Sequence, residues 1–243
     1  MVEESWYNPY DWYLTNTLNQ IKFLEEIKFM GFIKKYIHFS TPEVYGNFSN
    51  NLRENNYFNP STPYANSRAC ADIHLINLQK NYKFPAIITR TANVYGESQD
   101  IYRIIPKTIC SLILGKKVFL DGRGKSIRSF IYMLDVCDAL YKIMKKGITG
   151  NTYHISTNKF ISIKSLCEKI AKKIKVNTKN LVLVDKDRMS KDHTYKLSSV
   201  KIRSNLNWTD KISLDDGLSR TISWCMNNLS KISEKDFTHR HRK

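Results

Sequence analysis

The hydrophobic and polar positions in the first part of the chain follow two different periods. Residues 9–30 carry apolar side chains at helical spacing, and a second helix is predicted over 63–82. Residues 35–40 and 84–90 are short apolar runs, which are typical of buried strands. Helices that alternate with short apolar strands predict βα units on a parallel sheet, and therefore an α/β fold.

The first helix has clear start and end signals. The alternation of predicted helices and strands then continues to the end of the chain. Asn8 is the expected N-cap of that helix, Pro9 its first residue and Gly31 its stop. Loops are predicted over 46–63 and 92–96. Further helices are predicted over 104–115, 133–147, 162–174, 198–208 and 213–229, and further strands within 117–132 (two, around a glycine turn), at 151–156 and at 181–184. We expect the polar last ten residues to be frayed.

Composition and length suit one large globular domain or two small ones. The chain has 243 residues, of which 42% are hydrophobic and 25% charged. It contains no apolar run of about eighteen residues and no secretory signal pattern, so we predict no membrane span. The five cysteines lie far apart without a C-x-x-C pair, which predicts reduced thiols in a cytoplasmic protein and no metal site.

The net charge is +17, from 39 Lys and Arg against 22 Asp and Glu. A basic surface of this kind is compatible with nucleic-acid binding. The lysines are spread along the chain, however, and a smaller anion such as a nucleotide diphosphate fits the sign of the charge equally well. We therefore rank nucleic acid last among the possible partners.

Three segments are predicted to meet at one edge of the sheet. Ligands of parallel sheets bind beyond the carboxyl ends of the strands, where "STPEVYG" and "TANVYG" follow two predicted strands. Between them lies a helix in which Tyr64 and Arg68 are four residues apart and share a face. A cation beside a phenol favours the phenolate, which would make Tyr64 a base. Thr41 and Glu43 could bind and deprotonate a substrate, or serve only as a helix cap and a solvated carboxylate.

Six segments, in order, resemble the extended short-chain dehydrogenase/reductase (NAD-dependent epimerase/dehydratase) family. They are "YIHFSTPEVYG", "NPSTPYANSRACAD", "ITRTANVYG", "RSFIYMLDVCDAL", "NTYHIS" and "KIRSNLNW". Within this family the chain is most similar to the nucleotide-sugar 4,6-dehydratases, in particular those that act on dTDP-glucose. The resemblance covers residues 2–228.

The resemblance implies a mechanism with NAD as cofactor and a nucleotide-diphosphate sugar as substrate. Tyr64, assisted by Thr41 and the charge of Arg68, would deprotonate the sugar 4-hydroxyl while NAD takes the hydride. Glu43 would then remove the C5 proton, and the 6-hydroxyl would leave as water. Asn16 falls at the position of an active-site asparagine near the cofactor. The residues implied for the nucleotide diphosphate are Asn93, Lys107, Arg128 and Arg188, and arginine suits this task because it pairs with phosphate in a fork.

Two catalytic positions depart from the pattern of the dehydratases. The basic residue of the helix is usually lysine and here is Arg68, which keeps the charge but cannot share a proton at neutral pH. Pro42 stands where the dehydratases carry an aspartate that protonates the leaving 6-hydroxyl. Glu43 favours dehydratase or decarboxylase chemistry, whereas Pro42 weakens the case for the dehydratase. A 4-epimerase, a UDP-glucuronate decarboxylase and a non-catalytic sugar-nucleotide-binding subunit therefore remain alternatives.

The third departure concerns the cofactor phosphates. A dinucleotide site of this type needs a glycine-rich turn that follows the first strand and opens a helix. The nine glycines begin at Gly31, and G-x-x-G-x-x-G is absent. We expect a truncated or split form of such an enzyme, which is not active alone.

The resemblance also implies two lobes and a dimer. A Rossmann-like doubly wound parallel sheet without its first βα units is expected over 1–96 and 129–157, and a smaller α/β substrate lobe over 97–128 and 158–232. Residues 233–243 would form a frayed basic tail. The helices at 9–30 and 63–82 could pair two copies of the chain.

Overall fold

The computed structural model describes residues 2–48, 51–186, 194, 196–233 and 237. The helices are α1 (Pro9–Tyr13), α2 (Asn19–Ile27), α3 (Pro63–Tyr82), α4 (Ile104–Ile113), α5 (Met133–Lys146), α6 (Ile163–Lys173), α7 (Val200–Leu206), α8 (Leu214–Asn227) and α9 (Leu229–Ser233). The strands are β1 (Tyr36–Ser40), β2 (Ala86–Thr91), β3 (Asn93–Tyr95), β4 (Val118–Asp121), β5 (Ile127–Arg128), β6 (Phe130–Tyr132), β7 (Thr152–Ile155), β8 (Ile161–Ser162) and β9 (Leu181–Val184). Single 3₁₀ or π turns are η1 (Glu3–Trp6), η2 (Leu14–Leu18), η3 (Pro42–Tyr45), η4 (Gly122–Gly124) and η5 (Thr178–Asn180). None of the helices described has the length and apolar character needed to cross a membrane.

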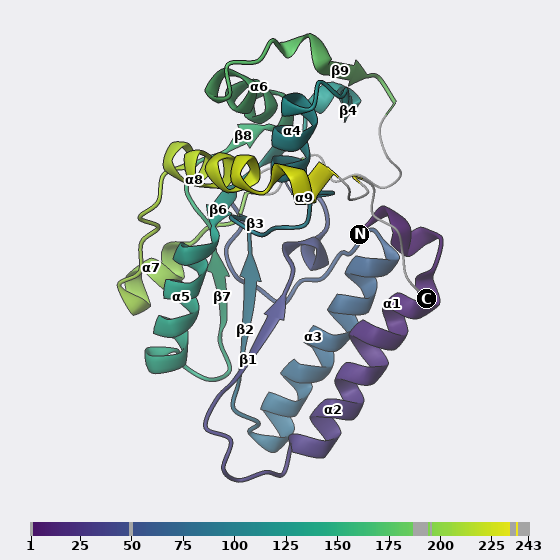
Figure 1. Ribbon diagram of the computed structural model, residues 1–243. Helices are drawn as coiled ribbons and strands as arrows, with labels where there is room; N and C mark the ends of the chain where they lie inside the picture. Colours follow the sequence, from purple (N-terminus) through teal and green to yellow (C-terminus); the bar gives the residue numbers. More distant parts are fainter. Residues whose placement is uncertain (1, 49–50, 187–193, 195, 234–236, 238–243) are drawn as a thin grey trace.

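A parallel sheet with the order β1-β2-β7 forms the centre of the larger layer. Helices α2 and α3 cover one face of this sheet, and α5 and α7 cover the other (Figure 1). The arrangement confirms the predicted α/β, Rossmann-like class. Strand β1 lies at an edge, and its outer side pairs with no strand among the residues described.

Strand β2 explains why both faces of the sheet need a helical cover. All six of its residues are buried. Ile88 packs with Leu24 and Leu75 from α2 and α3. Ile87 points the other way and packs with Ile143 of α5. Because successive strand side chains point to opposite faces, one apolar run supplies two hydrophobic clusters.

The smaller layer contains short strands that pair over long distances in the sequence. β4 pairs with β9 in parallel, β5 with β8 in antiparallel fashion, and β3 with β6 in parallel. Helices α4, α6 and α8 lie over these strands at the top of Figure 1. Trp208 and Ile202 of the α7 region pack instead with β7 and α5 on the central sheet. The two-lobe division with its boundaries at 96, 129, 157 and 232 stays a prediction.

Most predicted elements are confirmed, and three differ in an instructive way. Helix α3 has the predicted bounds of 63–82. The helix predicted over 9–30 is present but contains the π turn η2, and its regular part ends at Ile27. Residues 92–96 were predicted as a loop, which is wrong, because Asn93–Tyr95 pairs with β6. The segment 117–132 holds three strands rather than two, and each pairs with a distant strand.

Candidate functional site

A cleft of about 540 Å³ opens beyond the carboxyl ends of β1 and β2. Five of the residues predicted from the sequence line it, namely Thr41, Glu43, Tyr64, Asn93 and Lys107. They come from the end of β1, from η3, from the first turn of α3, from β3 and from α4. The predicted convergence of these segments on one edge of the sheet is therefore present in the fold.

The turn after β1 fixes Thr41 and Glu43. The Thr41 side chain caps η3 by accepting a hydrogen bond from the Glu43 N–H at 3.3 Å, with Pro42 at the first helical position. Val44 is fully buried and anchors the turn. Gly46 then ends it with φ = 73°, and a Cβ at this position would lie 2.2 Å from the Asn59 carbonyl oxygen. Only glycine fits such a conformation and such a close approach.

Tyr64 is held in the first turn of α3. Thr62 caps this helix by accepting a hydrogen bond from the Ala65 N–H at 3.1 Å. The Trp12 ring of α1 packs edge-on against the Tyr64 ring, with the centroids 5.4 Å apart. Thr41 is also near enough to Tyr64 to lower the pKa of the phenol.

The ionisation of Tyr64 differs from the sequence expectation. Burial raises the pKa of Tyr64 above its ordinary value, and the charge of Glu43 raises it further. Arg68, the Thr41 side chain and the charge of Arg103 lower it, in that order, without overcoming the first two effects. The charge of Arg68 thus lowers the pKa of Tyr64 in the expected direction, but burial and Glu43 outweigh it. A buried phenolate beside a carboxylate is costly, and one guanidinium offsets only part of that cost.

The remaining predicted residues lie outside the lining of the cleft. Arg68 turns towards β1, where its Nη2 donates to the Phe39 carbonyl. Asn16 lies in the π turn η2 and donates from Nδ2 to Ser67 Oγ at 3.1 Å, which joins this turn to α3. Arg128 lies on β5 and donates to the carbonyl of Ile127 at 2.8 Å. Arg188 lies outside the described residues.

A family model described as GDP-mannose 4,6 dehydratase matches residues 1–221. The chain belongs to this family. The human dTDP-D-glucose 4,6-dehydratase is 35% identical over 202 residues, a match that covers 81% of this chain and 57% of the human protein. The chain thus spans little more than half the length of that relative.

Solved structures of dehydratases have the same fold as this family member. The dTDP-glucose 4,6-dehydratase of Streptomyces venezuelae, solved with NAD bound, is 27% identical with a TM-score of 0.90, over 95% of this chain and 71% of that chain. The enzyme of the same name from Bacillus anthracis, also solved with NAD, is 30% identical with a TM-score of 0.84, over 90% of this chain and 70% of that chain.

Sequence reasoning missed several residues of the site in this family member. Arg103, Tyr102, Asp121 and Thr91 all line the cleft. Arg103 precedes α4 by one residue, and Lys107 lies four residues later on the same side of the helix. That i, i+4 spacing of two cations at a helix start was the available signal, because a helix N-terminus already favours anions.

A buried ion pair beneath the site was also missed. Arg90 of β2 donates to Asp72 of α3, and Asp72 in addition accepts a hydrogen bond of 2.7 Å from the Ser40 hydroxyl. The Arg90 guanidinium also lies over the Tyr45 ring, 4.4 Å from its centroid. These contacts tie the end of β1, the η3 turn and α3 together. An arginine inside an otherwise apolar strand was the signal in the sequence, because arginine is rarely buried without a partner.

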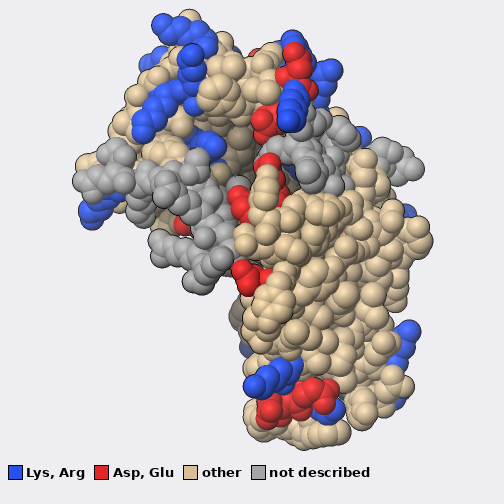
Figure 2. Space-filling model, turned by 90° about the vertical axis from the view of Figure 1, so that its right-hand side faces the viewer, with Lys and Arg blue, Asp and Glu red and all other residues tan. Residues whose placement is uncertain are grey.

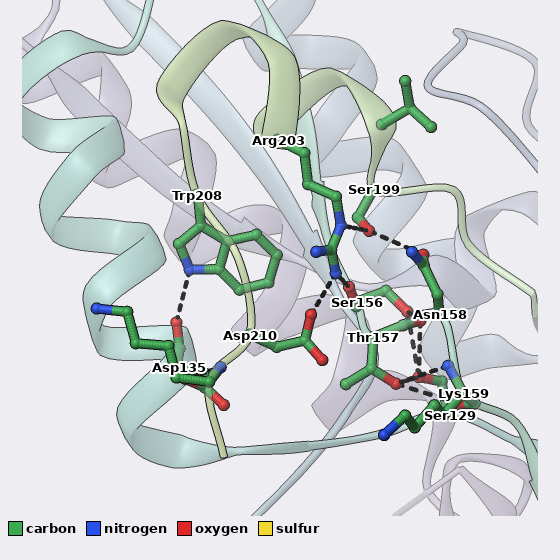
Figure 3. A network of polar contacts seen from close by, with 12 residues as sticks. Ser129, Asp135, Ser156, Thr157, Asn158, Lys159, Ser199, Arg203, Trp208 and Asp210 are labelled. Atoms are coloured by element: carbon green, nitrogen blue, oxygen red, sulfur yellow. Dashed lines mark hydrogen bonds and ion pairs between the residues drawn. The ribbon is translucent and has the colours of Figure 1, made fainter. Parts of the chain in front are cut away.

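A second polar network fixes the segment that leads from α7 to α8 (Figure 3). The Asp135 carboxylate accepts from the backbone N–H groups of Lys211 and Ile212 at 2.9 and 3.0 Å. Trp208 Nε1 donates to the Asp135 carbonyl at 3.1 Å, and Arg203 pairs with Asp210. The "KIRSNLNW" segment of the family thus attaches the end of α7 to the first turn of α5.

Proposed function

We propose that the chain carries the catalytic side chains of an NAD-dependent nucleotide-sugar 4,6-dehydratase that acts on a substrate like dTDP-glucose. The observation that carries this proposal is the meeting of Thr41, Glu43 and Tyr64 in one cleft at the carboxyl edge of the sheet. The identity to dTDP-glucose 4,6-dehydratases supports the same activity. Members of this class are lyases of nucleotide-sugar metabolism.

In this proposal each residue has one task. Tyr64 takes the proton of the sugar 4-hydroxyl, and the nearby Thr41 side chain stabilises the phenolate as it forms. Glu43 removes the proton at C5, which the 4-keto group has made acidic. Asn93 and Lys107 bind the nucleotide diphosphate, together with Arg128 and Arg188 from outside the described lining of the cleft. Lys107 sits near the N-terminal end of α4, where the helix dipole also favours an anion.

The residues present fit one end of NAD and not the other. A hydroxyl pair, Thr41 and Tyr64, lines the cleft, and the charge of Arg68 reaches Tyr64, so the reacting ring of the cofactor has partners here. NAD, when bound, supplies the acceptor and donor of a hydride. The described residues contain no glycine-rich turn that opens a helix after a strand, which is the usual cradle for the pyrophosphate. We therefore propose that this chain alone binds NAD weakly.

Pro42 favours a second candidate function on the same site. Its side chain lines the cleft beside Glu43, at the position where the resemblance predicts a proton donor for the leaving 6-hydroxyl. Proline has no proton to donate. Inversion at C4 and loss of a carboxylate need no such donor, so a 4-epimerase or a UDP-glucuronate decarboxylase is the alternative. A binding subunit that keeps the cleft without turnover is a third possibility.

The test is incubation of the 243-residue chain with NAD and dTDP-glucose, and separately with NAD and UDP-glucuronate. A 4-keto-6-deoxy product, which absorbs in alkali, supports the dehydratase, and release of carbon dioxide supports the decarboxylase. Calorimetry with each ligand alone accompanies both assays. Binding of dTDP-glucose without any turnover would support a binding subunit. Absence of sugar-nucleotide binding would overturn the proposed function, and tight stoichiometric binding of NAD would overturn the proposal of weak cofactor binding.

We also propose that two copies of the chain pair through α1, α2 and α3. Exposed apolar side chains gather on these helices, among them Tyr10, Leu18, Phe23, Ile73 and Tyr82. Figure 2 shows a broad uncharged surface on the side of the molecule where α1 and α2 lie. Exposed apolar side chains that gather on one face of a domain are typical of an interface between proteins.

A further inference from the structure

Phe39 of β1 is an aromatic residue that the fold leaves partly uncovered. It is 44% exposed, whereas His38 and Ser40 on either side of it are buried. Phe39 lines the cleft that also contains Thr41 and Tyr64. Binding pockets combine apolar and aromatic surface with a few polar groups that orient the ligand. Phe39 supplies such a surface close to two hydroxyl groups.

The alternation of β1 directs Phe39 and Thr41 to the same face. His38 Nε2 lies 3.3 Å from Asp72 Oδ1, and the Ser40 hydroxyl donates to Asp72 Oδ2 at 2.7 Å, so these two side chains point towards α3. Thr41 continues the extended backbone, with φ = −136° and ψ = 147°. Because successive side chains of an extended chain point to opposite faces, Phe39 and Thr41 share the other face, about 6.6 Å apart along the strand.

The walls of the cleft differ in character. The cations Arg103 and Lys107 belong to α4 and its start, and suit the sugar diphosphate. Phe39, by contrast, lies on the edge strand β1, whose outer side pairs with no strand in the part of the chain that the structure describes. Its carbonyl accepts a hydrogen bond from the Arg68 guanidinium. The cleft thus offers charge to a diphosphate from α4 and an exposed aromatic ring to a second, flat ligand from β1.

We propose that the nicotinamide ring of NAD stacks on the Phe39 ring, next to the sugar carbon that loses its hydride. This inference rests on the proposed function, because it takes hydride transfer as the reaction. Reacting atoms must come within about 3–3.5 Å of each other, so the nicotinamide ring has to lie beside the hydroxyl that Tyr64 and Thr41 hold. Phe39 is the preceding side chain on the Thr41 face of β1, and offset stacking of aromatic rings is favourable.

The test uses nicotinamide mononucleotide, which carries the nicotinamide ring but lacks the adenosine half of NAD. Proton NMR follows this ligand at millimolar concentration. The wild-type chain is expected to shift the nicotinamide protons upfield, because they lie over an aromatic ring, and to shift the ribose protons less. Phe39→Leu, which keeps an apolar side chain without a ring, is expected to abolish the upfield shift and to bind about fivefold more weakly. Phe39→Tyr keeps the ring and is expected to behave as the wild type.

The matched control is Phe119→Leu, at a second exposed aromatic residue, which lines the same cleft from β4. This variant is expected to leave both the upfield shift and the affinity for nicotinamide mononucleotide unchanged. Thermal unfolding of each variant, measured without ligand, shows whether it is folded. Since Phe39 is only partly covered in the fold, we expect Phe39→Leu and Phe39→Tyr to unfold at nearly the wild-type temperature.

The inference is overturned if the wild-type chain does not shift the nicotinamide protons, if Phe39→Leu shifts them as the wild type does, or if Phe39→Tyr or Phe119→Leu loses the shift to the same degree as Phe39→Leu. Calorimetry with dTDP-glucose tests the proposed function separately, and Phe39→Leu is expected to bind this sugar nucleotide as the wild type does. A wild type that binds dTDP-glucose without shifting the nicotinamide protons contradicts this inference alone. A wild type that does not bind dTDP-glucose contradicts the proposed function.

Discussion

Arg90 Nη2 lies 2.8 Å from Asp72 Oδ2, and both side chains are completely excluded from solvent. Strand β2 and helix α3 are thereby joined beneath the turn that carries Thr41 and Glu43. Burial alone would raise the pKa of Asp72, but the nearby His38 ring, 3.3 Å away, and the charge of Arg90 lower it below the ordinary value. Asp72 is therefore held as a carboxylate by partners that the fold supplies.

We expect Asp72→Asn to destabilise the chain by about 3–5 kcal/mol, because it leaves the buried Arg90 charge without its counter-ion. Chemical denaturation measures the free energy of unfolding. The matched control is Asp185→Asn, which removes the carboxylate of the exposed pair Arg123–Asp185 and is expected to cost less than about 1 kcal/mol. Equal effects of the two substitutions would contradict a special role for the buried pair.

His154 gives the stability a dependence on pH in the acid range. Burial, followed by the charge of Arg90, lowers the pKa of His154 to about 3. In the unfolded chain an ordinary histidine takes up a proton near pH 6.5, so between about pH 6.5 and 3 the unfolded state binds a proton that the folded state does not. The folded state is therefore expected to lose stability as the pH falls through this window, by up to about 1.4 kcal/mol per pH unit.

Urea denaturation at a series of pH values between 7 and 4 measures this slope. His154→Gln should flatten it, since glutamine cannot be protonated in either state. The glutamine variant will be less stable near pH 7, because the His154 ring makes hydrogen bonds to Tyr45 and to the Ser198 carbonyl. An unchanged slope in the variant would show that another group causes the acid sensitivity.

Tyr64→Phe separates binding from chemistry. The phenyl ring keeps the edge-on packing with Trp12, so we expect the fold and the affinity for dTDP-glucose to change by less than about threefold, as for the loss of one weak hydrogen bond. Turnover of dTDP-glucose, measured with NAD in large excess because its binding is proposed to be weak, should be abolished, because the proton acceptor is removed. Tyr57→Phe, at an exposed tyrosine, is the control and should behave as the wild type.

The same assay measures how the turnover rate depends on pH, and the pKa of Tyr64 predicts the direction of that dependence. Since the pKa of Tyr64 is raised above its ordinary value, the fraction of phenolate increases with pH throughout the neutral range. The rate of the wild-type reaction should therefore increase as the pH is raised from 7 to 9. A rate that falls over this range would contradict Tyr64 as the base.

The sequence predicted most of the helices and strands and the meeting of the site residues at one edge of the sheet. It did not predict the hydrogen bonds and ion pairs that those residues make. The start of α3 follows from a local signal, Pro63 at the first helical position after Thr62, which the fold leaves unchanged. Residues 93–95 form a strand only because β6, more than thirty residues later, pairs with them. Pairing of this kind is set by the tertiary fold and overrides local preference.

The chemistry of the site was likewise predictable from the sequence only in part. Tyr64 and Thr41 could be placed together from the order of the strands, because parallel strands end at one edge. The direction in which the Tyr64 pKa shifts could not be predicted from the sequence. It depends on burial and on the distance to Glu43 as well as on the expected cation.

The proposed pairing through α1, α2 and α3 predicts the oligomeric state of charged variants. Leu18 is 55% exposed in the π turn between α1 and α2, and Ile73 is 43% exposed on α3. Leu18→Lys and Ile73→Lys place a charge in the proposed interface, where its desolvation opposes association, so both are expected to be monomers where the wild type is a dimer. The control is Ile148→Lys, which charges a residue of similar exposure (58%) two positions after α5, a helix that covers the other face of the sheet. Sedimentation velocity measures the mass of each species, and a wild type that is monomeric at all concentrations, or a Leu18→Lys variant that still dimerises, would exclude this interface.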